Sequence, residues 1–381
     1  MKKIDVINGL RGFAILWVIF FHLFYSNVPA GRFPVSLGGV DLFPIAFLGH
    51  GWVGVNLFFI LSGFVLYLPY AEGRRKLASA ADAAAFYGHR AARLLPLYYL
   101  SILLSMFFFF DILHRDAQAL RNLLLMVTAT FNFTRDMWFP KYNGVLWSIG
   151  IEIWFSLLFP VLLLLGRRLG LVRLFVVVAA IGLATRFLGV IYWEHFPIDS
   201  LHFNPIKDSV LGRMDDFVLG MLAAGLYVKR LRPRPLAYPA PLFFAGVVLV
   251  ALGCNLWDYH HLERLHWAAV PFLSNLFHAG FALIMVSLLS MEGGAVRFVF
   301  TNRPVQVIGM MCYSLYVWHQ MTIYAVIRDN EYTAFNLTAY FAVLFAIAGI
   351  TYRYVEFGRK DLRALFLLGP GGGGAPGAGA G

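Results

Sequence analysis

The chain has 381 residues, of which 60% are apolar and only 13% are charged, and its formal net charge is +11. Soluble domains carry about 25% charged residues, so the composition excludes an ordinary soluble protein and predicts a polytopic membrane protein in contact with the lipid bilayer. In such a chain a basic balance reflects cytoplasmic loops beside anionic lipid, and we expect no nucleic-acid partner. Cys254 and Cys312 lie in separate apolar runs, which predicts neither a disulfide framework nor a metal site.

The first apolar run, residues 6–27, carries two residues that a membrane helix normally excludes, Arg11 and His22. Eleven positions make about three helical turns plus roughly 20°, so both side chains should lie on nearly one face, about 16 Å apart along the axis. Ionisable residues inside a span usually mark a functional site. The plainer alternative is that the two side chains extend to the inner and outer headgroups. The run is longer than the core of a signal peptide, so we expect a retained first span.

Apolar runs long enough to cross a bilayer predict ten spans. If the shorter run 120–133 does not cross and the N-terminus is inside, 19 Lys or Arg residues lie on the inner side and 8 on the outer side. The positive-inside rule therefore favours this arrangement, with both termini cytoplasmic and 120–133 re-entrant or interfacial. The predicted spans are 6–27, 51–70, 94–113, 145–166, 171–193, 210–228, 238–256, 267–290, 305–327 and 335–357.

The predicted fold is therefore an all-α bundle of about ten transmembrane helices, forming one domain over residues 1–360 in a bacterial inner membrane. Residues 361–381 are mostly Gly, Ala and Pro, which predicts a disordered tail. We find no internal repeat, which argues against a transporter built from inverted halves.

Several ionisable or polar residues are predicted at a similar depth near the outer face, because they begin inward spans or end outward ones. A histidine and a carboxylate at one depth can supply a general base and the group that orients it, and His22 with Glu152 is the pair we favour. The alternative is a structural network in which Arg213 and Asp215 pair with each other and Glu152 pairs with a residue of another helix. The residues at this depth are His22, Trp147, Ser148, Glu152, Arg213, Asp215 and His319.

At the inner face, Arg90 and Arg93 lie three residues apart on one side of a predicted helix, and Arg11 is near the same face. Guanidinium pairs of this kind suit bidentate contact with phosphates. The alternative is ordinary positive charge at the inner end of a span. Ser62 and Gly63, on the second span, predict a small-residue packing surface rather than a nucleophile, because no GxSxG elbow is present.

Together these motifs resemble acyltransferase family 3, a family of integral membrane proteins, over nearly the whole chain. The resemblance rests on motifs in family order: Asn8-Gly-Leu-Arg11-Gly with His22, Phe58-Phe59-Ile-Leu-Ser62-Gly63, Arg90-x-x-Arg93, Leu146-Trp147-Ser148-Ile-Gly-Ile-Glu152, Arg213-Met-Asp215, Tyr313-Ser-Leu-Tyr-Val-Trp-His319 and Tyr352-Arg-Tyr-Val-Glu356.

The resemblance implies about ten spans and transfer of an acyl group, commonly acetyl, from cytoplasmic acyl-CoA to a carbohydrate or similar acceptor beyond the membrane. It implies essential roles for His22 and Arg11, and a place near the CoA phosphates for Arg90 and Arg93. Two features depart from the pattern. The sequence carries no fused SGNH-type hydrolase domain, so we expect the membrane domain or a partner to complete the transfer. Glu356 is followed by Phe-Gly-Arg359 where Arg-Pro is common.

Our hypothesis is a membrane O-acetyltransferase that needs no metal and acylates a carbohydrate or glycolipid hydroxyl. Acyl-CoA docks on Arg11, Arg90 and Arg93, and His22, oriented by Glu152, takes the proton of the acceptor hydroxyl. Trp147, Ser148, Arg213, Asp215 and His319 are then predicted to contact the substrate. An acyl-histidine intermediate at His22 is a variant. A proton-coupled transporter or flippase that uses the same buried ionisable residues is the alternative function, and a purely structural or sensory protein is the third.

Overall fold

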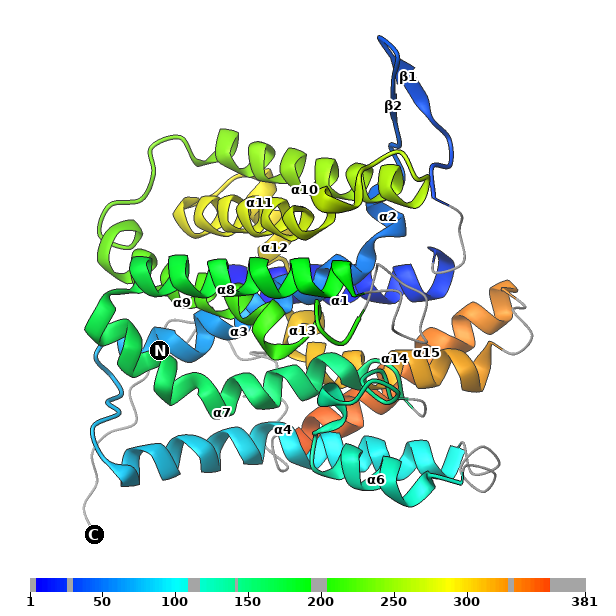
Figure 1. Ribbon diagram of the computed structural model, residues 1–381, viewed down its shortest axis with the longest axis horizontal. Helices are drawn as coiled ribbons and strands as arrows, with labels where there is room; N and C mark the ends of the chain where they lie inside the picture. The colour runs from blue at the N-terminus through cyan, green and yellow to red at the C-terminus, as the bar shows by residue number, and fades with distance from the viewer. Residues whose placement is uncertain are drawn as a thin grey trace.

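The computed structural model describes residues 5–25, 30–108, 117–140, 143–192, 204–327 and 332–356, and the predicted tail at 361–381 lies outside this part of the chain. The long helices lie side by side along the longest dimension of the molecule, which confirms the all-α bundle (Figure 1). The helices are α1 (Asp5–Phe20), α2 (Ala46–Gly49), α3 (Gly54–Ala71), α4 (Ala80–Phe108), α6 (Ala119–Val127), α7 (Leu146–Leu169), α8 (Leu171–Ile191), α9 (Val210–Leu226), α10 (Pro239–His261), α11 (Val270–Ser290), α12 (Ala295–Thr301), α13 (Arg303–Met310), α14 (Cys312–Val326) and α15 (Ala334–Thr351).

Within the described residues, eight helices are long and apolar enough to cross a membrane, and each overlaps one of the ten predicted spans. The other two predicted spans are helical but do not fit this simple pattern. Residues 210–228 correspond to α9, which is 17 residues long and contains Arg213, Asp215 and Asp216. Residues 305–327 are divided at Met311 into α13 and α14. Charge and a break in the helix therefore separate these two segments from the uniformly apolar spans.

The run predicted as re-entrant forms the short helix α6, followed by a 3₁₀ turn at Phe131–Phe133. Nine residues make a helix of about 13 Å, less than half of a hydrocarbon core of about 30 Å, so α6 does not cross. It packs beside the second half of α4, where the hydroxyl of Tyr99 donates to the carbonyl of Val127 at 3.2 Å. The chain turns back through Ala129, whose φ is +53°. A short helix followed by a turn agrees with the prediction that this run does not cross, and whether it is re-entrant or interfacial stays a prediction.

Small residues bring helices into close contact at the centre of the bundle. A Cβ on Gly63 of α3 would lie 1.9 Å from the carbonyl oxygen of Phe217, and one on Gly220 of α9 would lie 1.9 Å from that of Ile60. Side chains would separate these helices, so glycine sets the α3–α9 distance. The predicted packing role of Gly63 is confirmed, whereas Ser62 faces a cavity.

The arrangement of the helices leaves α1 and α3 between two groups. α10 and α11 pack together on one side, and α4 with α6 lies on the opposite side (Figure 1). A short hairpin, β1 (Val35–Leu37) and β2 (Val40–Leu42), projects from the segment between α1 and α2. Strand β2 is held to α10, because the hydroxyl of Tyr259 donates to the carbonyl oxygen of Asp41 at 2.8 Å. α1 and α3 are therefore surrounded by other helices, an arrangement that can enclose an internal site.

Candidate active site

A cavity of about 330 Å³ lies between α1, α3, α4, α7 and α14. It contains five of the ten residues that the sequence singles out: Arg11, Arg90, Arg93, Ser148 and Glu152. The rest of the wall is mainly aromatic and aliphatic, with a few polar groups, a lining typical of a small-molecule site. The other lining residues are Val55, Phe58, Phe59, Ser62, Val65, Leu94, Ile149, Cys312, Tyr313 and Tyr316.

Arg90 and Arg93 lie on one face of α4 because residues three apart are neighbours on a helix. Arg90 donates from Nη2 to Oε1 of Glu152 at 2.5 Å and from Nε to the hydroxyl of Ser156 at 3.0 Å. Arg93 forms an ion pair with Glu356 at the end of the last helix. Glu356 also accepts a hydrogen bond from Ser314 at 2.6 Å. The charge of each arginine on α4 at the cavity wall is therefore compensated by a carboxylate.

Arg11 differs from both of these arginines. It lines the cavity from α1 and makes no hydrogen bond or ion pair with any residue of the described part of the chain. Among the described residues, the three guanidinium groups at the cavity have two carboxylates as partners, those of Glu152 and Glu356. A cation without a carboxylate in a partly closed cavity favours an anionic ligand. Arg11 thus leaves a positive charge at the cavity wall that no carboxylate of the described residues balances.

Tyr316 and Ser148 are two of the polar residues that line the cavity. The hydroxyl of Ser148 donates to the phenol oxygen of Tyr316 at 2.7 Å, which joins α7 to α14. Trp147, its neighbour in sequence, does not line the cavity. It is 5% exposed and packs edge-on against Phe59, with the ring centroids 6.3 Å apart. α7 thus turns Trp147 toward its helical neighbours, and its predicted contact with the substrate stays a prediction.

His22 and His319 lie together just beyond Tyr316. The ring centroids of Tyr316 and His319 are 5.5 Å apart, and those of His319 and His22 are 4.9 Å apart. His319 has no exposed surface, and His22 is partly buried. Arg11 shares the cavity with Cys312 of α14, and His22 contacts His319 of the same helix. The two ionisable residues of α1 therefore both lie along α14, in agreement with the one-face prediction.

Glu152 does not occupy the place predicted for it. We expected its carboxylate to orient His22, but the carboxylate forms an ion pair with Arg90 across the cavity. A guanidinium is a permanent charge with five donors, so it satisfies a carboxylate better than a neutral imidazole does. The imidazole of His22 instead contacts the carbonyl oxygen of Val18 at 2.9 Å and Nε2 of His319 at 3.4 Å. His22 and Glu152, which were expected to bond to each other, therefore have different bonding partners.

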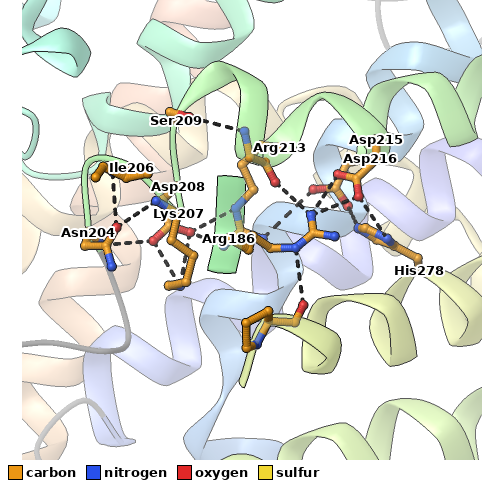
Figure 2. A network of polar contacts seen from close by, with 12 residues as sticks. Arg186, Asn204, Ile206, Lys207, Asp208, Ser209, Arg213, Asp215, Asp216 and His278 are labelled. Carbon is orange, nitrogen blue, oxygen red and sulfur yellow. Dashed lines mark hydrogen bonds and ion pairs between the residues drawn. The ribbon is translucent and has the colours of Figure 1, made fainter. Parts of the chain in front are cut away.

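Arg213 and Asp215 also lie outside the cavity wall, in a buried network where α8, α9 and α11 meet (Figure 2). They do not pair with each other. Asp215 accepts from Nη1 of Arg186 at 2.8 and 3.1 Å, and Arg213 donates to Asp208. His278 lies between the two carboxylates of α9, with Nε2 2.8 Å from Asp216. The structural alternative thus describes these residues better than substrate contact, although with other partners.

Apart from His278, the network contains equal numbers of positive and negative side chains. Arg186, Lys207 and Arg213 lie among Asp208, Asp215 and Asp216, which is three cations for three carboxylates. Burial lowers the pKa of Lys207 to about 8, although Asp208 beside it favours the charged form. Burial raises the pKa of Asp208, but Lys207 and Arg213 outweigh that effect and hold the pKa below its usual range.

Asp215, Asp216 and His278 bring ligand-type atoms within 4.8 Å of one another, a spacing that could hold a metal ion. Charge argues for another interpretation. The guanidinium of Arg186 already bonds to both oxygens of Asp215, and that of Arg213 lies 4.0 Å from Asp216. A divalent cation would add positive charge to a group that is already neutral, so we interpret the cluster as an ionic network.

Sequence reasoning missed several members of both sites. Glu356 was visible as a carboxylate at the end of an apolar span, but its partner on α4 was not. Arg186 is another charge within a span, and Asp208 and His278 needed the packing of α8, α9 and α11 to be recognised. Tyr316 lies inside the motif Tyr313-Ser-Leu-Tyr-Val-Trp-His319, but the motif did not show that this tyrosine lines a cavity. A charge inside an apolar run was the signal that could have found Arg186 and Glu356.

Comparison with known proteins gives a consistent result. A family model described as "Acyltransferase domain" matches residues 4–353. The chain is 25% identical to "Peptidoglycan O-acetyltransferase OatA" of Listeria monocytogenes, over 93% of this chain and 55% of that protein. It is 23% identical to "Putative peptidoglycan O-acetyltransferase YrhL" of Bacillus subtilis, over 84% and 49%. It is 28% identical to "Putative acetyltransferase ORF330" of Acidianus two-tailed virus, over 52% of each chain.

The chain spans about half the length of the curated relatives it matches. No solved structure matches it.

Proposed function

The chain belongs to the acyltransferase family whose domain model covers residues 4–353, and we propose that it is a membrane O-acetyltransferase. In this proposal it moves an acetyl group from acyl-CoA to a hydroxyl of an extracytoplasmic carbohydrate. Two relatives are named for O-acetylation of peptidoglycan, so a cell-wall glycan is the acceptor class that we favour. The observation that carries the proposal is the cavity, in which an uncompensated guanidinium lies at one side and a histidine pair lies beyond the other.

The donor would be held by the charged side of the cavity. Arg11 supplies a cation for the phosphates, and Arg90 and Arg93 lie on the same cavity wall. The cavity volume of about 330 Å³ is near the lower end of the range of about 300–1,000 Å³ for ligand sites, so it suits one end of a CoA molecule rather than all of it. The acyl end would then extend toward Ser148 and Tyr316.

His22 would act as the general base. As the acceptor oxygen attacks the thioester carbonyl carbon, its proton passes to the imidazole, and the carbon–sulfur bond breaks when the tetrahedral intermediate collapses. The imidazolium returns the proton to the leaving thiolate. A hydroxyl is a poor nucleophile until its proton is removed, and a positioned base contributes about 10²–10⁴-fold to such a step. The position of His22, next to the Tyr316 end of the cavity through His319, supports this role.

The test uses purified protein in proteoliposomes, with radiolabelled acetyl-CoA as donor and soluble cell-wall glycan fragments as acceptor. We expect His22→Ala to lower transfer by about 10²–10⁴-fold. The matched control is His266→Ala, which removes an exposed imidazole from the segment before α11 and should leave the rate unchanged. A wild-type rate in His22→Ala would contradict the assignment. Proton-coupled substrate flux in the absence of any acyl donor would favour the transporter alternative instead.

A further inference from the structure

A second imidazole contacts the proposed base. His319 of α14 is 0% exposed, and its Nε2 lies 3.4 Å from Nδ1 of His22 on α1. In serine hydrolases a carboxylate commonly lies at this position beside the catalytic imidazole. Glu152 was expected to fill that role, and its carboxylate is bonded to Arg90. The structure therefore raises the question of what an imidazole can do there.

Hydrogen bonds to backbone carbonyls determine which nitrogen of His319 carries the proton. Its Nδ1 lies 2.7 Å from the carbonyl oxygen of Tyr316. A carbonyl oxygen only accepts, so Nδ1 must be the donor and carry hydrogen. A neutral imidazole has one N–H, so the lone pair of His319 is on Nε2, the atom that faces His22.

The same argument fixes the proton of His22. Its Nδ1 lies 2.9 Å from the carbonyl oxygen of Val18, one turn earlier on α1, so this nitrogen also carries hydrogen. The hydrogen is then shared between the carbonyl of Val18 and Nε2 of His319, and such three-centre bonds are longer than simple ones. The lone pair of neutral His22 is therefore on Nε2, where a proton can be taken up.

His22 lies where α1 changes its helical form. α1 continues into a π turn over Phe21–Tyr25. Such turns occur frequently at functional sites. The side chain that contacts Val18 and His319 therefore starts from an irregular part of the helix.

From this geometry we propose that His319 is a positioning residue, and the inference rests on the proposed function of His22 as the base. His319 accepts the Nδ1–H of His22 and so keeps Nε2 of His22 unprotonated and directed at the acceptor hydroxyl. When Nε2 takes the hydroxyl proton, the lone pair of His319 stabilises the resulting imidazolium. The proton then leaves from Nε2 to the thiolate sulfur. His319 exchanges no proton during this cycle.

The proposal predicts a specific kinetic pattern. His319→Ala should lower kcat by about 100-fold or more, as expected when a base loses its orientation, while the KM for acetyl-CoA stays within about twofold. His319→Gln should recover at least tenfold of that loss, because its side-chain carbonyl can accept the same hydrogen bond. The control is Thr322→Val on the same helix. Thr322 is buried, and within the described residues its hydroxyl bonds only to the carbonyl of Trp318, so the kcat of Thr322→Val should match the wild type.

The measurements also separate this proposal from the one on which it rests. Equal activity in His319→Ala and the wild type, with His22→Ala inactive, would overturn the positioning role and leave the base intact. Full activity in His22→Ala would remove the proposed function itself. If His319→Ala does not fold, ¹⁵N NMR of the histidine-labelled wild-type protein decides the question. The His22 signal, identified by its loss in His22→Ala, should show hydrogen on Nδ1, and hydrogen on Nε2 alone would contradict the inference.

Discussion

Two groups of arginine and carboxylate residues lie within the bundle, and they differ in charge balance and in what surrounds them. In the network of α8, α9 and α11, three cations face three carboxylates, and Arg186 is 1% exposed. At the cavity, three arginines face two carboxylates, and Arg11 has no carboxylate partner within the described chain. Arginine inside a membrane protein is thus not informative by itself. Its charge balance and its access to a cavity distinguish a structural cation from one that can bind a ligand.

The largest expected effect is on stability and lies in the network. Asp215→Asn should lower the free energy of unfolding by about 3–5 kcal/mol, because it leaves the charge of Arg186 buried without its carboxylate. Thermal unfolding in detergent measures this change. Replacing both partners, Arg186→Met with Asp215→Leu, should cost less than the single change, since no buried charge remains. A single variant as stable as the wild type would show that the network is not structural.

A smaller effect, on binding and not on stability, is expected at Arg11. Arg11→Ala should weaken CoA binding by about 10- to 100-fold, since a charge-assisted hydrogen bond contributes about 1.5–3 kcal/mol. Its melting temperature should not fall, because no ion pair is lost within the described chain.

Isothermal titration of the detergent-solubilised protein with CoA measures the affinity of Arg11→Ala. Arg11→Lys keeps the charge without the planar fork and should give an intermediate affinity. Arg173→Ala, which removes an exposed arginine near the start of α8, is the control. Unchanged affinity in Arg11→Ala would show that the donor binds elsewhere.

The sequence predicted which residues are unusual better than it predicted their partners. The bundle, the short returning segment at α6 and the arginine face of α4 all follow from apolar runs, charge counts and helical spacing. The depth of a residue along the membrane normal can be estimated in this way, but its position within the membrane plane cannot. Glu152 and His22 were placed at one depth, and the carboxylate bonds to Arg90 on the facing helix.

The remaining differences have related causes. Arg213 and Asp215 share a helix with Gly220, and the glycine packs against α3 while the charged side chains bond toward α8 and the segment before α9. Which face points where depends on the order of neighbouring helices, and local periodicity carries no information about that order. The π turn after α1 is also absent from the pattern, because one extra residue in a turn leaves an apolar run unchanged.

The smallest expected effect tests whether a change at the cavity wall affects catalysis by the histidine pair. Ser148 donates to the phenol oxygen of Tyr316, whose ring lies between the cavity and His319. Ser148→Ala should lower the transfer rate by about fivefold, the equivalent of one neutral hydrogen bond of about 1 kcal/mol, with little change in CoA affinity. Ser101→Ala, which removes a buried hydroxyl bonded to a backbone carbonyl of α4, should have no effect on transfer.

The double-mutant cycle with Tyr316→Phe sharpens this test. If the two hydroxyl groups act as one unit, the double variant should lose no more activity than the more severe single variant, because residues that share one hydrogen bond are not additive. Additive losses would mean that Ser148 and Tyr316 act separately, and that the bond between them does not connect the cavity with the histidines. Non-additive losses would show that Ser148 and Tyr316 act as one functional unit, which lies next to the His319 ring because the ring centroids of Tyr316 and His319 are 5.5 Å apart.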